Sequence, residues 1–262
     1  MQKYENFSKK IKTLFIGKDL QYLPSCQSTN TYAFELIQNE DYFDGTVVLT
    51  DEQTAGRGQA GNTWEAEAGQ NITMSLILCP KFLTVQEQFF LNMAITLAIH
   101  DFLLAFVPEK QVLQIKWSND LLYLKKKIAG VLIQNIISQG YISKSVIGIG
   151  ININQRSFIF EGATSLNILT GLMYDLEFLV AKLLEKIEAR YWKLKERKFE
   201  ELRQDYYQNL YAWQEYSPFE SENEVWWGKI LGVDEWGMLL IERNGISHKF
   251  NFKEIKFLLG SV

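Results

Sequence analysis

A glycine-rich loop with one arginine is the segment of this chain best suited to bind an anion. Residues 52–64 read Glu-Gln-Thr-Ala-Gly-Arg-Gly-Gln-Ala-Gly-Asn-Thr-Trp and follow a short β-branched run. The three glycines, Gly56, Gly58 and Gly61, can adopt positive φ angles that bring backbone N–H groups together. Arg57 adds a planar set of donors that suits phosphate or carboxylate. The alternative is an ordinary surface connection with a solvated arginine.

A second polar group follows another apolar strand. Residues 116–120 read Lys-Trp-Ser-Asn-Asp, and three consecutive lysines stand just before the next apolar run. A hairpin between the two segments would bring Lys127 back near Asp120, with its ammonium directed toward the ligand-binding face of the sheet. For Lys125 and Lys126, at the tip of that hairpin, a solvated turn is an equally good explanation.

Small and polar residues also alternate with isoleucine in the run Gly-Ile-Gly-Ile-Asn-Ile-Asn. In a strand, alternate residues share a face. The residues sharing this face would be Gly148, Gly150, Asn152 and Asn154. Glycine inside a strand often marks the close approach of a ligand, and asparagine can bind the edge of a heterocycle. Close packing of a helix on the sheet is the alternative.

Ser28 and Thr29 stand where a predicted strand passes into a helix, in the sequence Cys-Gln-Ser-Thr-Asn. Serine is a common N-cap, because its hydroxyl accepts a hydrogen bond from the first helical turn. The two hydroxyls could instead bind a ligand carbonyl. Both explanations remain open from the sequence.

The usual catalytic signatures are absent from the sequence. The only histidines, His100 and His248, lie in a predicted amphipathic helix and a predicted hairpin, so a structural role is favoured over a Ser/His/Asp set. There is no Walker A sequence, no dinucleotide fingerprint and no metal-ligand cluster. Any chemistry must then depend on arginine, lysine and amide groups, with a metal ion that arrives on a nucleotide.

Composition narrows the class of protein. The chain has 262 residues and a net charge of −4, which disfavours a constitutive nucleic-acid or anionic-membrane surface. Cys26 and Cys79 are far apart and fit free thiols in a reducing cytosol. No stretch approaches the length of a membrane span, and residues 1–18 lack the apolar core of a signal peptide. We therefore predict a cytoplasmic protein that binds neither nucleic acid nor membrane.

Hydrophobic patterning predicts a mixed sheet of about six strands covered by helices. The predicted strands are Leu20–Leu23, Thr46–Thr50, Ile72–Leu78, Val112–Trp117, Ile128–Ile137 and Val146–Ile153. The predicted helices are Ser28–Gln38, Val85–Phe106, Leu176–Lys198 and Phe199–Tyr211. The last two helices are expected to cover the sheet and end the first domain.

From Tyr216 onward the pattern changes to short alternating strands separated by turn signals. The predicted strands are Val225–Leu231, Gly237–Glu242 and Ser247–Phe252. Asn244-Gly245 is a strong hairpin signal between the last two. We therefore predict two domains, a catalytic domain over residues 1–213 and a small antiparallel β barrel over residues 214–262.

Taken in order, these motifs closely resemble those of biotin protein ligases, the enzymes that attach biotin to a carrier lysine. The matching segments are Ser28–Asn30, Gln53 with Gly56–Trp64, Lys116–Asp120, Lys127–Gly130 and Gly148–Asn152, and Gly228–Gly237 resembles part of the family's C-terminal domain. The resemblance implies an α+β fold. It consists of a mixed sheet flanked by helices, akin to class II aminoacyl-tRNA synthetases, plus a small C-terminal SH3-like β barrel.

The resemblance also implies a reaction in two steps. The carboxylate of biotin attacks the α-phosphate of MgATP and gives biotinyl-AMP and pyrophosphate; a carrier lysine then attacks the acyl carbon and releases AMP. By family position, Lys127 bridges the carboxylate and the α-phosphate, and Arg57 closes over the intermediate with its loop. Asp120 orients the incoming lysine. Preorganised cations of this kind stabilise the charge that develops on oxygen.

Family position assigns the binding residues as well. Ser28, Thr29 and Gln53 fall where the ureido ring of biotin binds. The remaining biotin-binding positions are Gly56, Arg57, Gly58, Trp64, Lys127, Leu132, Gly148 and Gly150. The nucleotide-binding positions are Gln59, Asn119 and Asn152.

The chain departs from the family pattern at several positions. Gln59 and Asn62 stand where arginine is common, Ser118 replaces a common proline, and Gln134 replaces a common glutamate. Fewer cations then hold the phosphate of the adenylate, and no protein ligand for magnesium is predicted. About twenty residues precede the predicted catalytic domain, too few for the DNA-binding domain of some members, so DNA binding is not expected.

The expected substrates are biotin and ATP with Mg²⁺, and the expected partner is a biotin carboxyl carrier protein. The sequence leaves a homodimer open. Two alternatives remain: a lipoate ligase or octanoyltransferase of the same architecture, and a ligand-binding regulator without chemistry. The Gly-Arg-Gly sequence of the loop favours biotin.

Overall fold

The computed structural model describes Tyr4 and residues 7–259 of the chain, so the outer bounds of the predicted domains, residues 1 and 262, lie outside the described residues. Its centre is a seven-stranded sheet with the order β1-β2-β3-β7-β6-β5-β4. Its strands are β1 (Leu20–Cys26), β2 (Val47–Gln53), β3 (Ile72–Leu78), β4 (Leu113–Lys116), β5 (Asp120–Tyr123), β6 (Lys126–Ser138) and β7 (Tyr141–Ile151). Strands β1 and β2 are parallel and the other neighbours are antiparallel, which confirms a mixed sheet.

Strand β5 is the member of this sheet that the hydrophobic pattern did not predict. Only four residues long, it is too short to show an alternation of its own. It forms the predicted hairpin with β6, and the tight turn between them uses positive φ angles at Leu124 and Lys125. The hairpin pairs Leu122 with Lys127, so the predicted return of the chain is confirmed.

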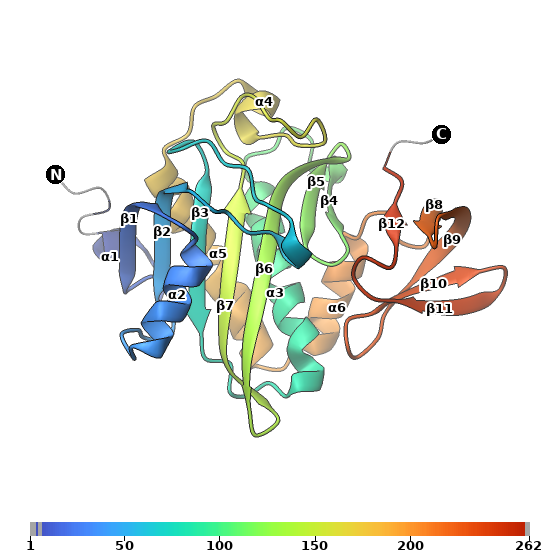
Figure 1. Ribbon diagram of the computed structural model, residues 1–262, viewed down its shortest axis with the longest axis horizontal. Coiled ribbons are helices and arrows are strands. Elements are labelled where there is room, and N and C mark those ends of the chain that lie inside the picture. The colour runs from blue at the N-terminus through green and yellow to red at the C-terminus, as the bar shows by residue number, and fades with distance from the viewer. Residues whose placement is uncertain (1–3, 5–6, 260–262) are drawn as a thin grey trace.

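Helices cover both faces of the sheet (Figure 1). Helices α3, α5 and α6 lie behind it, whereas α2 and the loop that contains η1 lie in front. The helical segments are α1 (Phe7–Lys10), α2 (Thr29–Gln38), η1 (Gln59–Gly61), η2 (Val85–Glu87), α3 (Gln88–Leu103), η3 (Lys110–Val112), α4 (Leu166–Thr170), α5 (Leu176–Lys195) and α6 (Phe199–Gln208). The four predicted helices are all present, with α3 shorter than expected because η2 precedes it.

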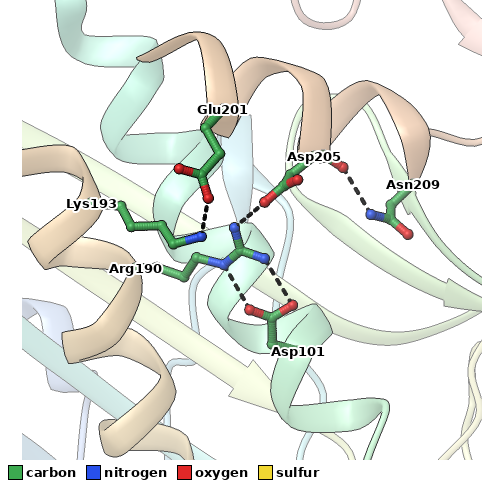
Figure 2. A network of polar contacts seen from close by, with 6 residues as sticks. All are labelled: Asp101, Arg190, Lys193, Glu201, Asp205 and Asn209. Carbon is green, nitrogen blue, oxygen red and sulfur yellow. Dashed lines mark hydrogen bonds and ion pairs between the residues drawn. The ribbon is translucent and has the colours of Figure 1, made fainter. Parts of the chain in front are cut away.

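A cluster of charged residues joins the three helices behind the sheet (Figure 2). Arg190 on α5 donates through Nε to Asp101 Oδ2 at 2.7 Å and through Nη2 to Asp101 Oδ1 at 3.0 Å. Its Nη1 donates to Asp205 on α6, and Lys193 pairs with Glu201 alongside. We call Asp101, Arg190, Lys193, Glu201 and Asp205 the Arg190 cluster. It fixes α3, α5 and α6 relative to one another.

A second, five-stranded antiparallel sheet follows α6, with the order β11-β10-β9-β8-β12. Its strands are β8 (Tyr216–Ser221), β9 (Glu224–Val233), β10 (Leu239–Arg243), β11 (Ile246–Phe250) and β12 (Lys256–Phe257). Asn244 and Gly245 form the predicted hairpin turn, with φ angles of 54° and 78°. Among the described residues, no ladder joins the edge strands β11 and β12, so hydrogen bonds do not close this sheet.

The second sheet contacts the first near strand β4. Trp117 donates through Nε1 to the carbonyl of Gly237 at 3.0 Å, and its ring lies 6.2 Å from that of Phe252. Gly237 also lies against Phe89, which is on helix α3.

No helix in the described part of the chain is long and apolar enough to cross a membrane.

Candidate active site

A cavity opens on the front face of the large sheet, between α2, the glycine-rich loop and strands β3, β6 and β7. Most of the residues predicted to form the site line it. They are Ser28, Thr29, Gln53, Arg57, Gly58, Gln59, Trp64, Asp120, Lys127, Leu132, Gly148 and Gly150. The structure thus brings together residues from five separate stretches of sequence.

Lys127 and Asp120 form an ion pair at this cavity, with 2.7 Å between Nζ and Oδ1. The pairing follows from the β5–β6 hairpin, whose two strands carry these residues. The backbone of Lys127 is fixed on its other edge as well, because its N–H donates to Gly162 and its carbonyl accepts from Thr164. About a third of each side chain is exposed, so the ammonium is held in place and still reachable from the cavity.

Arg57 lines the same cavity from the glycine-rich loop and is exposed. The loop folds back on itself: Arg57 and Thr63 form a β-bridge, Gly58 N–H donates to the Asn62 carbonyl, and Trp64 N–H donates to the Gly56 carbonyl. These N–H groups are therefore engaged within the loop, and anion binding by the loop stays a prediction. Of the three glycines, only Gly61 has a positive φ angle.

A polar network surrounds the residues predicted to bind the ureido ring. Gln53 Oε1 accepts from the N–H of Thr29 at 2.8 Å and from its hydroxyl at 3.1 Å. Ser75 donates to Asn30 at 2.6 Å and also lies 2.7 Å from the Thr29 hydroxyl. Ser28 is the N-cap residue of α2, but its side chain makes no capping hydrogen bond. Its hydroxyl therefore lines the cavity without the role that usually explains a serine there.

The two glycines of β7 allow close approach of other groups. A Cβ at Gly148 would lie 2.4 Å from Asn30 Oδ1, and one at Gly150 would lie 2.3 Å from Trp64 Cε2. The indole of Trp64 therefore rests directly on the strand, and the Lys127 ammonium lies 5.6 Å from its ring centroid. Trp64 Nε1 is buried without a hydrogen-bond partner in the described part of the chain.

Three of the predicted site residues lie behind the cavity wall. Gly56 carries the loop backbone against the carbonyl of Trp64. Asn119 is buried, and its carboxamide contacts Asn92 and Gln59. Asn152 is buried as well, donates to the Thr164 carbonyl, and leaves Oδ1 without a partner among the described residues. Their assigned ligand contacts remain predictions.

Other cavity residues were not predicted. They are Asn30, Asn62, Thr63, Thr73, Met74, Gly130, Val131, Ile149 and Phe252. Five of them lie within segments that the family resemblance included, so these five carried a signal: Asn30, Asn62, Thr63, Gly130 and Ile149. Thr73 and Met74 lie in a uniformly buried strand. Phe252 lies in the turn after β11, and no local pattern connects it with the cavity.

Lys116 is the titratable group beside the site whose pKa departs from its usual value. Burial lowers the pKa of its ammonium, the negative charge of Asp120 partly offsets this, and the positive charge of Lys127 lowers it further. Lys116 and Asp120 are paired across β4 and β5. The charges of Asp120 and Lys127 thus act on Lys116, whose ammonium lies 5.7 Å from the ring centroid of Phe257.

The donor set does not suit a protein-bound metal. Among the described residues, no group of three or more histidine, cysteine, aspartate or glutamate side chains could hold a metal ion.

A model of the biotin/lipoate A/B protein ligase family matches residues 22–152, the part of the chain that builds most of the cavity. The chain belongs to this family. A bifunctional ligase/repressor BirA of Bacillus spizizenii is 32% identical over 244 residues, covering 88% of this chain and 72% of the relative. A biotin–[acetyl-CoA-carboxylase] ligase of Mycobacterium tuberculosis is 31% identical over 176 residues, 66% of this chain and 64% of that one.

Solved structures agree with the sequence relatives. The biotin protein ligase of Aquifex aeolicus, in complex with biotin and ATP, superposes with a TM-score of 0.74 and 28% identity. The match covers 91% of this chain and 98% of that structure. It therefore includes both sheets of the present fold.

Proposed function

We propose that this chain joins biotin to a lysine of a carrier protein, with biotinyl-AMP as the intermediate. The observation that carries the proposal is that Arg57 and Lys127, far apart in sequence, line one cavity. Ser28 and Thr29, with their hydroxyls, and Gln53, with its carboxamide, line the same cavity. The similar ligases and the structure with biotin and ATP support the same activity.

In the first step, a carboxylate oxygen of biotin attacks the α-phosphorus of ATP and pyrophosphate leaves. Negative charge builds on the phosphate oxygens during this step. The Lys127 ammonium, held by Asp120, is placed to stabilise that charge, and Arg57 supplies a second cation from the loop. A single preorganised donor of this kind typically contributes about a hundredfold or more in rate.

In the second step, the amine of the carrier lysine attacks the acyl carbon, and the bond to AMP breaks. Asp120 is the group proposed to orient that lysine, since its carboxylate lies at the cavity beside Lys127. The loop over residues 56–64 limits access of water to the mixed anhydride. Hydrolysis of the intermediate is thereby slowed relative to transfer.

The proposed biotin site uses the polar network at the start of α2. The ureido ring has one carbonyl and two N–H groups, and each needs a partner when buried. Ser28 and Thr29 offer hydroxyls and Gln53 offers a carboxamide at this end of the cavity. Trp64, Leu132, Gly148 and Gly150 are proposed to enclose the apolar tail; Gly56, Arg57 and Gly58 are proposed to cover it.

The proposed nucleotide site lies toward Gln59, Asn119 and Asn152. Gln59 faces the cavity directly, whereas the other two lie behind its wall. The partnerless Oδ1 of Asn152 supports a contact that forms when a nucleotide binds and the wall adjusts. Magnesium is carried on the phosphates of ATP.

We also propose the finer architecture that the family resemblance implies. The large sheet is of the class II aminoacyl-tRNA synthetase type, and the second sheet is an SH3-like barrel with an open side. We place the boundary between a catalytic and a C-terminal domain at residues 213–214. The connection between the end of α6 and the start of β8, where this boundary falls, supports the division. A cytoplasmic location fits the two free cysteines.

The proposed acceptor is a biotin carboxyl carrier protein, consistent with the acetyl-CoA-carboxylase ligases that the chain resembles. Purified protein incubated with biotin, MgATP and an apo carrier domain should release AMP and label one lysine. Lipoate and octanoate in place of biotin test the alternative substrates of the same family. A biotin-dependent ATP–pyrophosphate exchange would exclude a regulator without chemistry, and an unlabelled carrier would contradict the ligase.

A further inference from the structure

Asn92 is a buried carboxamide on helix α3, where most neighbouring residues are apolar. Both ends of its side chain have a partner outside the helix. Nδ2 donates to the carbonyl of Ser118 at 3.0 Å, and Oδ1 accepts from Asn119 Nδ2 at 3.1 Å. The side chain therefore joins α3 to the short connection between β4 and β5.

The chain of carboxamides continues to the glycine-rich loop. Asn119 Oδ1 accepts from Gln59 Nε2 at 2.9 Å, and Gln59 begins the 3₁₀ turn η1. Gln59 lines the cavity, whereas Asn92 and Asn119 do not. We call the three residues Asn92, Asn119 and Gln59 the carboxamide relay. It runs from the hydrophobic core to the loop that holds Arg57.

The glycine-rich loop has few other connections to the sheet near its tip. Its start is held by Thr54 and Ala55, whose N–H groups donate to Cys26 and Gln27. Between those anchors and Trp64, the backbone hydrogen bonds run within the loop. They give the loop its shape. At the tip, the Gln59 side chain connects the loop to Asn119 at 2.9 Å and to the Val131 carbonyl at 3.5 Å.

A purely structural role does not account for Asn92. The carbonyl of Ser118 already accepts a hydrogen bond from Tyr206 Oη at 2.7 Å, so this oxygen is satisfied without Asn92. What Asn92 adds is an acceptor for Asn119 Nδ2, which holds the nitrogen end of the Asn119 carboxamide. The Ser118 hydroxyl donates to the oxygen end, Oδ1, at 3.2 Å. The resulting orientation presents Oδ1 to Gln59.

We propose that Asn92 is a positioning residue, which acts through Asn119 on Gln59 and so places the loop of Arg57 over the cavity. Asn92 does not line the cavity, and it is not among the positions that the family resemblance assigns. Its effect on loop position can be measured without substrates. Its effect on ATP use rests on the proposed function.

Limited digestion with trypsin tests the loop position directly, because Arg57 is an exposed trypsin site within the loop. Cleavage after Arg57 reports how often the loop leaves the cavity. We expect Asn92→Ala and Gln59→Ala each to accelerate this cleavage about tenfold, the effect of one or two lost hydrogen bonds. In the double variant the rate should not exceed that of the faster single variant, since both changes break one relay.

Thr96→Val is the matched control. Thr96 lies one turn further along α3, is fully buried, and its hydroxyl has no partner among the described residues. The substitution removes a buried polar group from the same helix without touching the relay, so cleavage after Arg57 should keep the wild-type rate. Asn92→Ser replaces Asn92→Ala if the alanine variant does not fold, because its shorter side chain cannot reach Asn119.

Two results would overturn the proposal. One is a wild-type cleavage rate in the Asn92 variants while Gln59→Ala is cleaved faster. The other is faster cleavage at all tryptic sites alike, which indicates global destabilisation. With active enzyme, the Asn92 variants should raise KM for ATP about tenfold with a smaller change in KM for biotin. A wild-type protein that fails to activate biotin would contradict the proposed function, whereas the digestion would still test the relay.

Discussion

The Arg190 cluster and the Lys127–Asp120 pair each join a cation to aspartate, but in different surroundings. The Arg190 cluster lies among the helices behind the large sheet (Figure 2), whereas the Lys127–Asp120 pair lines the cavity. Arg190 is 12% exposed and contacts two carboxylates, whereas Lys127 is 32% exposed and pairs with one. The first arrangement uses the geometry of the guanidinium to join three helices. The second leaves an ammonium at the edge of a cavity.

This difference separates charges that stabilise the fold from charges that can act on a ligand. A largely buried cation that contacts two carboxylates is costly to remove, because both partners then lose their compensation. A pair exposed by about a third contributes little to stability. Two polar groups near the cavity likewise have no evident role in stabilising the fold. Trp64 Nε1 has no hydrogen-bond partner among the described residues, and the Ser28 hydroxyl makes no capping hydrogen bond.

The largest expected effect is on the cavity side. Lys127→Met should reduce biotin-dependent ATP–pyrophosphate exchange about a hundredfold or more, because the charge that forms on phosphate loses its main cation. Biotin binding by calorimetry and the melting temperature should change little. If the melting temperature falls along with the activity, Lys127 stabilises the fold as the Arg190 cluster does, and the difference between the two groups of charges disappears.

The opposite pattern is expected behind the sheet. Arg190→Met should lower the free energy of unfolding by about 1–3 kcal/mol, between the values for exposed and buried ion pairs. The kcat of the protein that remains folded should stay within about twofold of wild type. Urea denaturation and initial rates at low temperature measure the two quantities. Full stability combined with lost activity would show that this cluster controls the site.

Ser28→Ala tests the comparison at a smaller scale. Loss of an N-cap hydroxyl usually costs about 1 kcal/mol of stability, but Ser28 makes no capping bond. We therefore expect an unchanged melting temperature and a weakening of biotin binding by about five- to tenfold, the effect of one lost hydrogen bond. Calorimetric titration with biotin measures this. Reduced stability with unchanged biotin affinity would identify Ser28 as a cap only.

Local patterns predicted the large sheet and its helices, because long apolar strands and amphipathic helices carry their own periodicity. Strand β3 was predicted at its observed bounds, Ile72–Leu78. The hairpin turn at Asn244-Gly245 also followed from sequence, since that pair readily adopts positive φ angles. Strands β5, β8 and β12 were not predicted. Strands β5 and β12 have only four and two residues, too few to show an alternation.

The candidate site was predictable where a motif contains its own geometry. Lys127 and Asp120 lie on two arms of one hairpin, so their spacing indicated their contact. Phe252 reaches the cavity only through packing of the second sheet against Trp117. Asn92 lies in a helix that looks like ordinary core, and its partners are set by tertiary contacts. Tertiary contacts of this kind cannot be predicted from a local sequence pattern.

His100 offers the smallest test, because it lies on α3 beside Asp101 of the Arg190 cluster and yet has one unused nitrogen. Its Nε2 contacts the Leu113 carbonyl at 3.2 Å, and Nδ1 has no partner among the described residues. Burial lowers the pKa of this imidazole, so the folded protein keeps it neutral. Below the unfolded pKa of about 6.5, the unfolded chain binds a proton that the folded chain does not, and stability falls with pH.

The expected loss is at most about 1.4 kcal/mol per pH unit below that point. His100→Gln keeps a side-chain donor for the Leu113 carbonyl and does not titrate. Between pH 7.5 and 5.5, the free energy of unfolding of this variant should therefore fall less than that of wild type. The carboxylates are the same in both proteins, so their contribution drops out when the two changes are subtracted. Equal slopes would mean that the imidazole is protonated in the fold, with Nδ1 donating to a partner. His100 would then join the charges that stabilise the helices behind the sheet.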